Sequence, residues 1–176
     1  STGRPKGVVL THDAVLASAM ATSSRLGTSS HDVWLSCLPL SHVGGLSVVT
    51  RALLTGAALA MHDGFDAAQV ETAAREGATA VSLVATALRR IDASLFRTIV
   101  LGGSRPPIDL PHHVFTTYGL TETGSGVVYD GVPLDGVEVR LVDGEVLLRG
   151  PMLLRAYRDR TLQPAGRAFV GSVRCV

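Results

Sequence analysis

The sequence predicts an α/β fold: a mostly parallel sheet with flanking helices, followed by a small antiparallel β region. Short apolar runs alternate with helix-like stretches over the first 136 residues, which is typical of a parallel sheet. From about residue 137, apolar and polar residues alternate with a period of two, which is typical of antiparallel strands. A hydrophobic content of 46% and a charged content of 18% fit a globular chain.

Helix and strand signals follow one another in order. The first helix is expected over residues 11–25, where Thr11 or Asp13 can cap its start and Gly27 ends it. Three later helices are expected. They cover residues 45–55, which end at Gly56, residues 66–76, which end at Gly77, and residues 86–91. The strands are expected at residues 8–10, 33–37, 57–61, 80–84, 98–101 and 114–118.

The antiparallel region starts with a hairpin signal. Residues 137–142 and 145–149 flank Asp143-Gly144, a pair that favours a type I′ turn because both positions need positive φ. We therefore predict three segments: an α/β core at 1–136, a β-hairpin region at 137–159 and a tail at 160–176.

Charge and cysteine content exclude several classes of protein. Sixteen basic residues against 15 acidic ones give a net charge of +1, and no basic stripe points to nucleic acid. Cys37 and Cys175 lack metal or redox spacing, which favours a reducing cytoplasm. No apolar run is long enough to span a membrane. A homo-oligomer is compatible with this composition.

The first seven residues combine hydroxyls, glycines and a lysine in one loop. Glycines let backbone N–H groups approach an anion, hydroxyls donate hydrogen bonds and lysine adds a compact positive charge. The loop is not a Walker A motif, because its lysine precedes the last glycine. It therefore indicates polyphosphate binding, and an ordinary Gly/Pro turn is the alternative. The candidate residues are Ser1, Thr2, Gly3, Lys6 and Gly7.

Two further motifs follow expected strands. Residues 38–45 place His42 where a strand gives way to a helix opened by Gly44-Gly45, a usual position for ligand contacts in α/β folds. A histidine that only caps the helix or fills a corner is the alternative. A buried strand ends at Gly102, Gly103 and Ser104, where a flat ligand can lie against the backbone. A plain turn after the strand is the alternative.

The fourth motif, residues 116–123, carries the most chemistry. Tyr118 can stack on an adenine ring, and Gly119 follows it. Thr121 can donate to an α-phosphate, and Glu122 can hold Mg²⁺, which prefers carboxylate and phosphate oxygens. A strand followed by a helix, with Thr121 as its cap and Glu122 in its first turn, is also consistent with the residues.

In this order, the four motifs resemble those of the adenylate-forming family: acyl-CoA synthetases, luciferases and peptide-synthetase adenylation domains. The resemblance implies ATP and AMP, Mg²⁺ and coenzyme A as ligands, and a carboxylic acid as substrate. It implies that Lys6 and the loop hydroxyls hold phosphates, and that His42 lines the acyl pocket. It further implies that Gly102, Gly103 and Ser104 border the acyl group and the adenine, and that Tyr118, Thr121 and Glu122 take the roles given above. Lys6, His42, Thr121 and Glu122 are thus the candidate catalytic residues.

Within this family, residues 32–40, 81–88 and 129–137 resemble the o-succinylbenzoate–CoA ligases of menaquinone biosynthesis. The implied reaction adenylates a carboxylate and then transfers the acyl group to the thiol of coenzyme A. Other aryl- or fatty-acyl-CoA ligases are the alternative.

The chain also departs from the family pattern. The start of the phosphate loop is missing, and a helix is expected to be lost around residues 106–113. The tail at 160–176 lacks the family's Thr-Gly-Asp motif, and the family's C-terminal domain with its catalytic lysine does not follow. Two hypotheses result: a fragment of a working acid–CoA ligase that is inactive alone, or a non-catalytic remnant.

Overall fold

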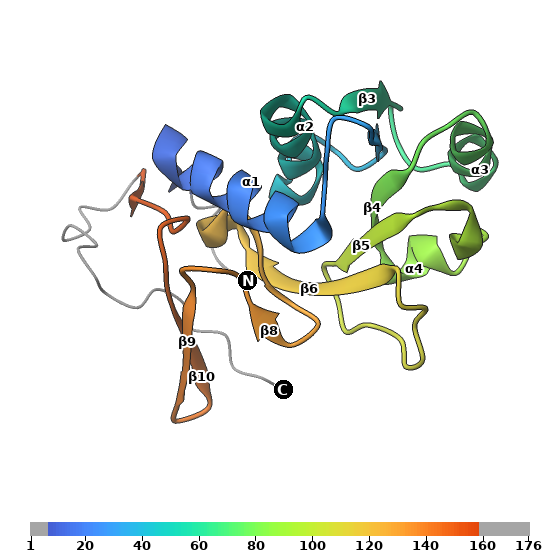
Figure 1. Ribbon diagram of the computed structural model, residues 1–176. Coiled ribbons are helices and arrows are strands. Elements are labelled where there is room, and N and C mark those ends of the chain that lie inside the picture. Colours follow the sequence, from blue (N-terminus) through green and yellow to red (C-terminus); the bar gives the residue numbers. More distant parts are fainter. Residues whose placement is uncertain (1–6, 159–176) are drawn as a thin grey trace.

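A computed structural model describes residues 7–158, which form a central sheet flanked by helices (Figure 1). The main sheet has seven strands, and the first five in spatial order are parallel while the last two are antiparallel. In that order the strands are β3 (Ala58–Met61), β2 (Val33–Ser36), β4 (Ala80–Val84), β5 (Thr98–Gly102), β6 (Val114–Leu120), β7 (Ser125–Tyr129) and β8 (Val132–Pro133). The predicted mostly parallel α/β sheet is confirmed.

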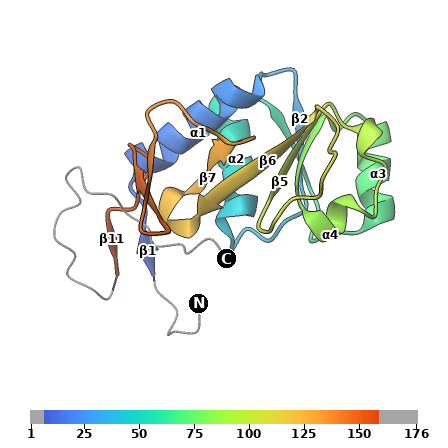
Figure 2. The same ribbon diagram turned by 90° about the horizontal axis from the view of Figure 1, so that it is seen from below.

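Helices cover both faces of this sheet (Figure 2). On one face lie α1 (His12–Leu26) and α2 (Val43–Thr55); on the other lie α3 (Ala67–Arg75), α4 (Ala85–Leu88) and the 3₁₀ turn η1 (Ala93–Leu95). Successive side chains of β2 alternate between the faces: Trp34 packs in the core with α1 and α2, and Leu35 packs in the core with α3 and α4. Both faces of β2 are therefore buried, as expected for a parallel strand.

The helix ends show how local sequence sets these elements. The Thr11 hydroxyl accepts from the Ala14 N–H at 3.1 Å, and Gly27 adopts a left-handed φ of 61°, as predicted for α1. For α2 the expected start at Gly45 is wrong by two residues, because Gly44 and Gly45 form its first turn. A Cβ on Gly45 would lie 2.4 Å from the Pro39 carbonyl oxygen, so the helix requires glycine there.

Short antiparallel pairs complete the described part. β9 (Glu138–Val142) and β10 (Glu145–Arg149) form the predicted hairpin, with φ of 49° at Asp143 and 77° at Gly144. β1 (Val8–Val9) pairs with β11 (Ala156–Tyr157), close to the other end of the described chain. The sequence prediction missed β7, β8 and β11, and it did not pair β1 with any strand.

The connection from β5 to β6 is short for two parallel strands. Residues 103–113 contain no helix, as expected from the sequence, and Asp109 takes a φ of 62°. Parallel strands are usually joined by a helix, so a crossover without one is unusual. No helix among residues 7–158 is long and apolar enough to cross a membrane.

Candidate functional site

Three of the four motifs end at one edge of the main sheet. β2, β5 and β6 run parallel, so their carboxyl ends lie at the same edge. His42 follows β2, Gly103 and Ser104 follow β5, and Glu122 follows β6. Open α/β sheets bind their ligands at this carboxyl edge. The fold therefore brings the predicted residues of these motifs to the edge where a ligand is expected.

Glu122 lies in the 3₁₀ turn η2 (Thr121–Thr123), directly after β6. The turn is held by Thr123, whose hydroxyl accepts from the Leu120 N–H at 2.9 Å and contacts the Ser125 carbonyl oxygen at 2.7 Å. The alternative of a helix capped by Thr121 is wrong, since no α-helix starts here and Thr121 is exposed. Its hydroxyl is therefore presented to solvent.

A tyrosine that belongs to none of the four motifs, Tyr157, orients Glu122. The Tyr157 hydroxyl donates to Oε1 of Glu122 at 2.8 Å, and the Leu154 N–H donates to the Glu122 carbonyl oxygen at 2.7 Å. Tyr157 lies on β11, directly opposite Val8 of β1. The strand that follows the predicted phosphate loop therefore runs beside the segment that holds Glu122.

This pairing also places the end of the loop. The Gly7 carbonyl oxygen accepts from the Arg158 N–H at 2.7 Å, so the loop's last residue is fixed next to β11. A Cβ on Gly124 would lie 3.7 Å from the Leu10 side chain, so the residue that follows β1 lies next to the end of the turn containing Glu122. Ser1, Thr2, Gly3 and Lys6 lie outside the described residues.

The glycines at the carboxyl edge have packing reasons of their own. A Cβ on Gly119 would lie 2.2 Å from the Ser125 carbonyl oxygen, at an irregularity in the pairing of β6 with β7. A Cβ on Gly102 would lie 2.8 Å from the Thr117 hydroxyl, and Gly103 takes a φ of 82°. Contacts of Gly102, Gly103 and Ser104 with a ligand stay a prediction.

The two aromatic candidates differ in exposure. His42 occupies the N-cap position of α2 but its side chain makes no capping hydrogen bond, so the alternative of a capping histidine is wrong. It is exposed at the carboxyl edge, where a ligand can reach it. Tyr118 is half-buried and packs against a cluster of three buried residues, which fixes its ring. The cluster consists of Val127, Leu148 and Met152.

Sequence reasoning missed Arg51, the one charged residue of α2. It is 1% exposed; its Nη1 donates to the Ser47 hydroxyl at 3.1 Å and its Nη2 to the Ser82 hydroxyl at 3.2 Å. Its guanidinium carbon lies 4.5 Å from the ring centroid of Trp34, within cation–π range.

Arg51 is a buried cation without a carboxylate partner among residues 7–158. Burial lowers the pKa of its guanidinium, which nevertheless stays charged at neutral pH. Its Nε is buried and has no hydrogen-bond partner. A single charge inside an otherwise uncharged helix was the sequence signal that could have revealed it.

The residues at the carboxyl edge fit a magnesium ion that arrives with a nucleotide. Within residues 7–158 no group of three or more acidic, histidine or cysteine side chains could form a protein cage for a metal. Mg²⁺ is commonly held by one or two carboxylates together with substrate phosphates and water. Glu122, oriented by Tyr157, supplies one such carboxylate.

Comparison with known proteins gives the family. The sequence profile described as "AMP-binding enzyme" matches residues 1–158, so the chain belongs to this family, as its motifs predicted. Over 90% of its length it is 36% identical to a probable 2-succinylbenzoate–CoA ligase of Mycobacterium tuberculosis, covering 47% of that protein. Over 91% it is 33% identical to the 2-succinylbenzoate–CoA ligase of Enterococcus faecalis, covering 41%.

A solved relative has the same fold. The o-succinylbenzoate coenzyme A synthetase of Bacillus subtilis, in complex with ATP and a magnesium ion, superposes with a TM-score of 0.86 at 27% identity. The match covers 97% of this chain and 44% of that protein. The chain therefore spans less than half the length of these relatives.

Proposed function

We propose that this chain forms the nucleotide- and acid-binding part of an ATP-dependent acid–CoA ligase that acts on o-succinylbenzoate. The observation that carries the proposal is the Tyr157–Glu122 hydrogen bond at 2.8 Å, because β11 is also paired with the strand that follows the phosphate loop. Strand β11 thus contacts both the carboxylate proposed to bind Mg²⁺ and the strand that follows the loop proposed to bind the phosphates.

The proposed reaction has two steps. A carboxylate oxygen of the acid attacks the α-phosphorus of ATP, the bond to the bridging oxygen breaks, and pyrophosphate leaves. The thiol of coenzyme A then attacks the acyl carbon, loses its proton, and AMP leaves. Magnesium, when bound, neutralises charge on the phosphates.

The chain's own residues contribute by positioning and electrostatics. Lys6 and the hydroxyls of Ser1 and Thr2 hold the β- and γ-phosphates, and Thr121 donates to the α-phosphate. Glu122 is kept in place by Tyr157. The remaining candidates lie around the nucleotide and the acid: Gly3, Gly7, His42, Gly102, Gly103, Ser104, Tyr118 and Gly119.

The buried charge of Arg51 favours the proposal that the substrate carries a second negative charge. o-Succinylbenzoate carries two carboxylates, and only one is adenylated. The charged guanidinium of Arg51, on the buried face of α2 and with an Nε that has no hydrogen-bond partner, is a suitable partner for the other. An aryl or fatty acid with a single carboxylate would leave Arg51 without this partner. ATP and coenzyme A as substrates favour action in the cytoplasm.

Lys6 gives a direct test, because it is the sole lysine in the sequence. Pyridoxal phosphate followed by borohydride reduction should label Lys6, and Mg-ATP should block the labelling in the wild type and much less in Glu122→Ala. Tandem mass spectrometry distinguishes Lys6 from the α-amine. Labelling of Lys6 that Mg-ATP never reduces would contradict the nucleotide site.

The acid needs a separate measurement. ATP–pyrophosphate exchange by the full-length ligase that contains this chain, measured with o-succinylbenzoate, benzoate and a fatty acid, compares one diacid with two monoacids. We expect exchange to be fastest with o-succinylbenzoate, and Arg51→Leu to remove that preference while circular dichroism stays unchanged. Equal exchange with all three acids would contradict the diacid, and exchange with none would support the non-catalytic alternative.

A further inference from the structure

The outer edge of β3 is an open strand edge. β3 is the terminal strand of the main sheet and, within the described residues, pairs only with β2. The Ala58 and His62 N–H groups donate to carbonyl oxygens of the β2 side, each at 2.9 Å. Because backbone groups alternate along a strand, Leu59 and Met61 direct their N–H and C=O groups outward.

This edge is short but carries no residue that blocks strand pairing. Neither proline nor a charged residue occurs in Ala58–Met61, and Met61 is 55% exposed. Exposed apolar edges of this kind are templates for another strand.

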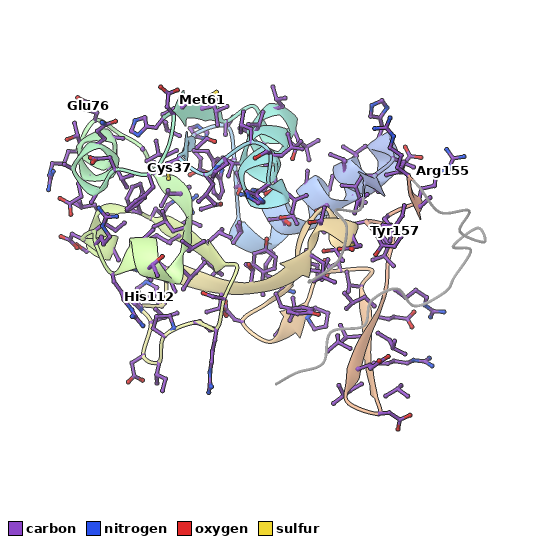
Figure 3. The ribbon with its side chains drawn as sticks, turned by 180° about the vertical axis from the view of Figure 1, so that it is seen from behind. Cys37, Met61, Glu76, His112, Arg155 and Tyr157 are labelled. Atoms are coloured by element: carbon purple, nitrogen blue, oxygen red, sulfur yellow. The ribbon has the colours of Figure 1, made fainter. Side chains whose placement is uncertain are left out.

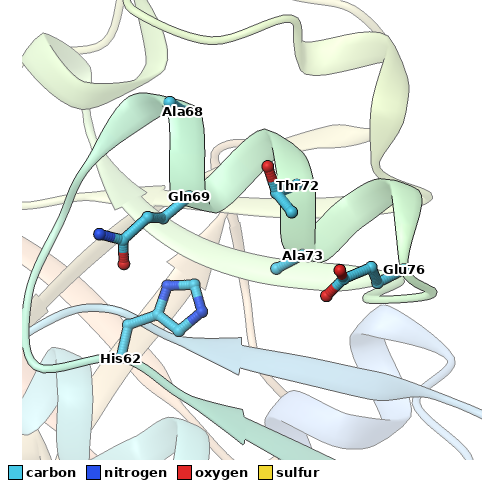
Figure 4. Close-up of a pocket in the computed structure, with 6 residues that line it drawn as sticks. All are labelled: His62, Ala68, Gln69, Thr72, Ala73 and Glu76. Atoms are coloured by element: carbon cyan, nitrogen blue, oxygen red, sulfur yellow. The ribbon is translucent and has the colours of Figure 1, made fainter.

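A pocket of about 250 Å³ lies beside this edge, between the end of β3 and α3 (Figure 4). The His62 ring lies below the helix, and Gln69, Thr72 and Glu76 line the pocket from α3. Nδ1 of His62 is buried and has no hydrogen-bond partner. Buried polar atoms normally have one, so His62 keeps an unused hydrogen-bonding atom next to the pocket.

The surroundings of the pocket are acidic. Glu76 lines the pocket and is exposed, and the exposed Asp66 accepts a hydrogen bond from the N–H of the lining residue Gln69, whereas the neighbouring cation Arg75 is paired with Glu71 at 3.0 Å. A lysine or arginine side chain is therefore the complementary occupant.

The outer edge of β3 and the pocket beside it form a groove between β3 and α3, and this groove is separate from the proposed nucleotide site. β2, β4 and β5 lie between β3 and β6, which places the two strands about 19 Å apart at the usual strand spacing. Figure 3 shows Met61 and Glu76 at one end of the molecule and Tyr157 toward the other.

We propose that the groove between β3 and α3 docks an extended, basic segment of a partner protein. The segment adds as a strand to the outer edge of β3, and its lysine or arginine side chain enters the pocket lined by His62, Gln69 and Glu76. Main-chain hydrogen bonds to Leu59 and Met61 supply affinity, and the pocket supplies the preference for a basic residue.

Fluorescence anisotropy with the full chain tests this proposal. The probe is a short labelled peptide of alternating threonine and valine with one central lysine, and its partner has glutamate in place of the lysine. We expect the lysine peptide to bind about tenfold more tightly, since one charge-assisted hydrogen bond is worth this much. Equal binding of both peptides, or binding of neither, would overturn the proposal.

Two variants locate the binding. Met61→Pro removes an outward N–H without removing a bond to β2, and proline is tolerated on strand edges. Glu76→Gln removes the carboxylate. Each should weaken the lysine peptide about tenfold, while Asp135→Asn, an exposed acid on another loop, should leave it unchanged. If Met61→Pro unfolds the chain, Glu76→Gln with the two peptides still decides.

A second copy of this chain is the competing occupant. Sedimentation velocity over a range of protein concentrations should show no association that depends on β3. A dimer that Met61→Pro abolishes would overturn the proposal in favour of self-pairing.

Discussion

The two edges of the parallel sheet use polar residues in opposite ways. At the amino edge, Asp32, Thr79 and Arg97 directly precede β2, β4 and β5. Asp32 is 4% exposed and accepts from the Ser29 N–H, the Thr79 hydroxyl and the Arg97 guanidinium, which tie three strands together. At the carboxyl edge, Glu122 accepts a hydrogen bond from one side chain, and His42 and Thr121 are exposed.

The difference separates stability from chemistry. A carboxylate with every acceptor site engaged stabilises the fold and is unavailable to a ligand. A carboxylate with one oriented oxygen and spare capacity can bind a cation brought by a substrate. Substitutions at the two edges should therefore act on different measurable quantities.

The largest effect is expected at the amino edge. Asp32→Asn should lower the free energy of unfolding by about 3 kcal/mol, because a buried ion-pair partner and acceptor is lost. The value lies at the low end of the range since the Arg97 side chain is 48% exposed. Urea unfolding measures this change. Mg-ATP affinity per folded molecule should be unchanged, and a parallel loss of affinity would break the separation of the two edges.

The same carboxylate gives a pH dependence. Burial raises the pKa of Asp32, but hydrogen bonds from Ser29, Arg97 and Thr79 outweigh burial and leave the pKa below its ordinary value of 3.8. A depressed pKa contributes stability that is complete above pH 3.8 and lost as pH falls through the folded-state pKa. Wild type should therefore lose this contribution in acid, and Asp32→Asn should have a flatter acid limb in urea unfolding. Identical acid limbs would exclude Asp32 as the source.

The carboxyl edge should respond in binding. Glu122→Gln should weaken Mg-ATP binding about tenfold, or about 1.4 kcal/mol, because a neutral amide is a poorer Mg²⁺ ligand. Titration with a fluorescent ATP analogue measures the affinity. Without Mg²⁺, wild type and variant should bind alike; a loss of equal size in both conditions would show that Glu122 does not act through the metal.

Tyr157 should have a smaller effect on the same site. Tyr157→Phe removes the hydroxyl that orients Glu122 but keeps the ring and the pairing of β11 with β1. One hydrogen bond is worth about 1 kcal/mol, so Mg-ATP binding should weaken about fivefold. The double variant with Glu122→Gln should be no weaker than Glu122→Gln alone, since the tyrosine acts through the carboxylate. Additive losses would mean that Tyr157 contacts the nucleotide itself.

Sequence predicted the elements that depend on local signals better than the long-range pairing that holds Glu122. Helix α1, strand β4 and the Asp143-Gly144 turn follow from caps, apolar runs and turn residues within a few positions. The pairing of Val8 with Tyr157 depends on contacts across most of the chain, which no local pattern contains. The candidate residues of the site were proposed from their motifs, whereas Tyr157 as the partner of Glu122 required the three-dimensional structure.

The smallest effect is expected at Cys37, which follows β2 at the carboxyl edge but points into the core with α3 and α4. Burial raises the pKa of its thiol to about 11, so the thiolate fraction at pH 8 is on the order of one in a thousand. Iodoacetamide should therefore leave Cys37 unmodified in the folded chain and alkylate it in urea, as followed by peptide mass spectrometry. The other cysteine, Cys175, lies outside the described residues and is distinguished by its own peptide. Fast alkylation of Cys37 under native conditions would show that the core becomes accessible at the carboxyl edge. The difference between the two edges would then extend to the carboxyl end of β2, which would be accessible to reagents.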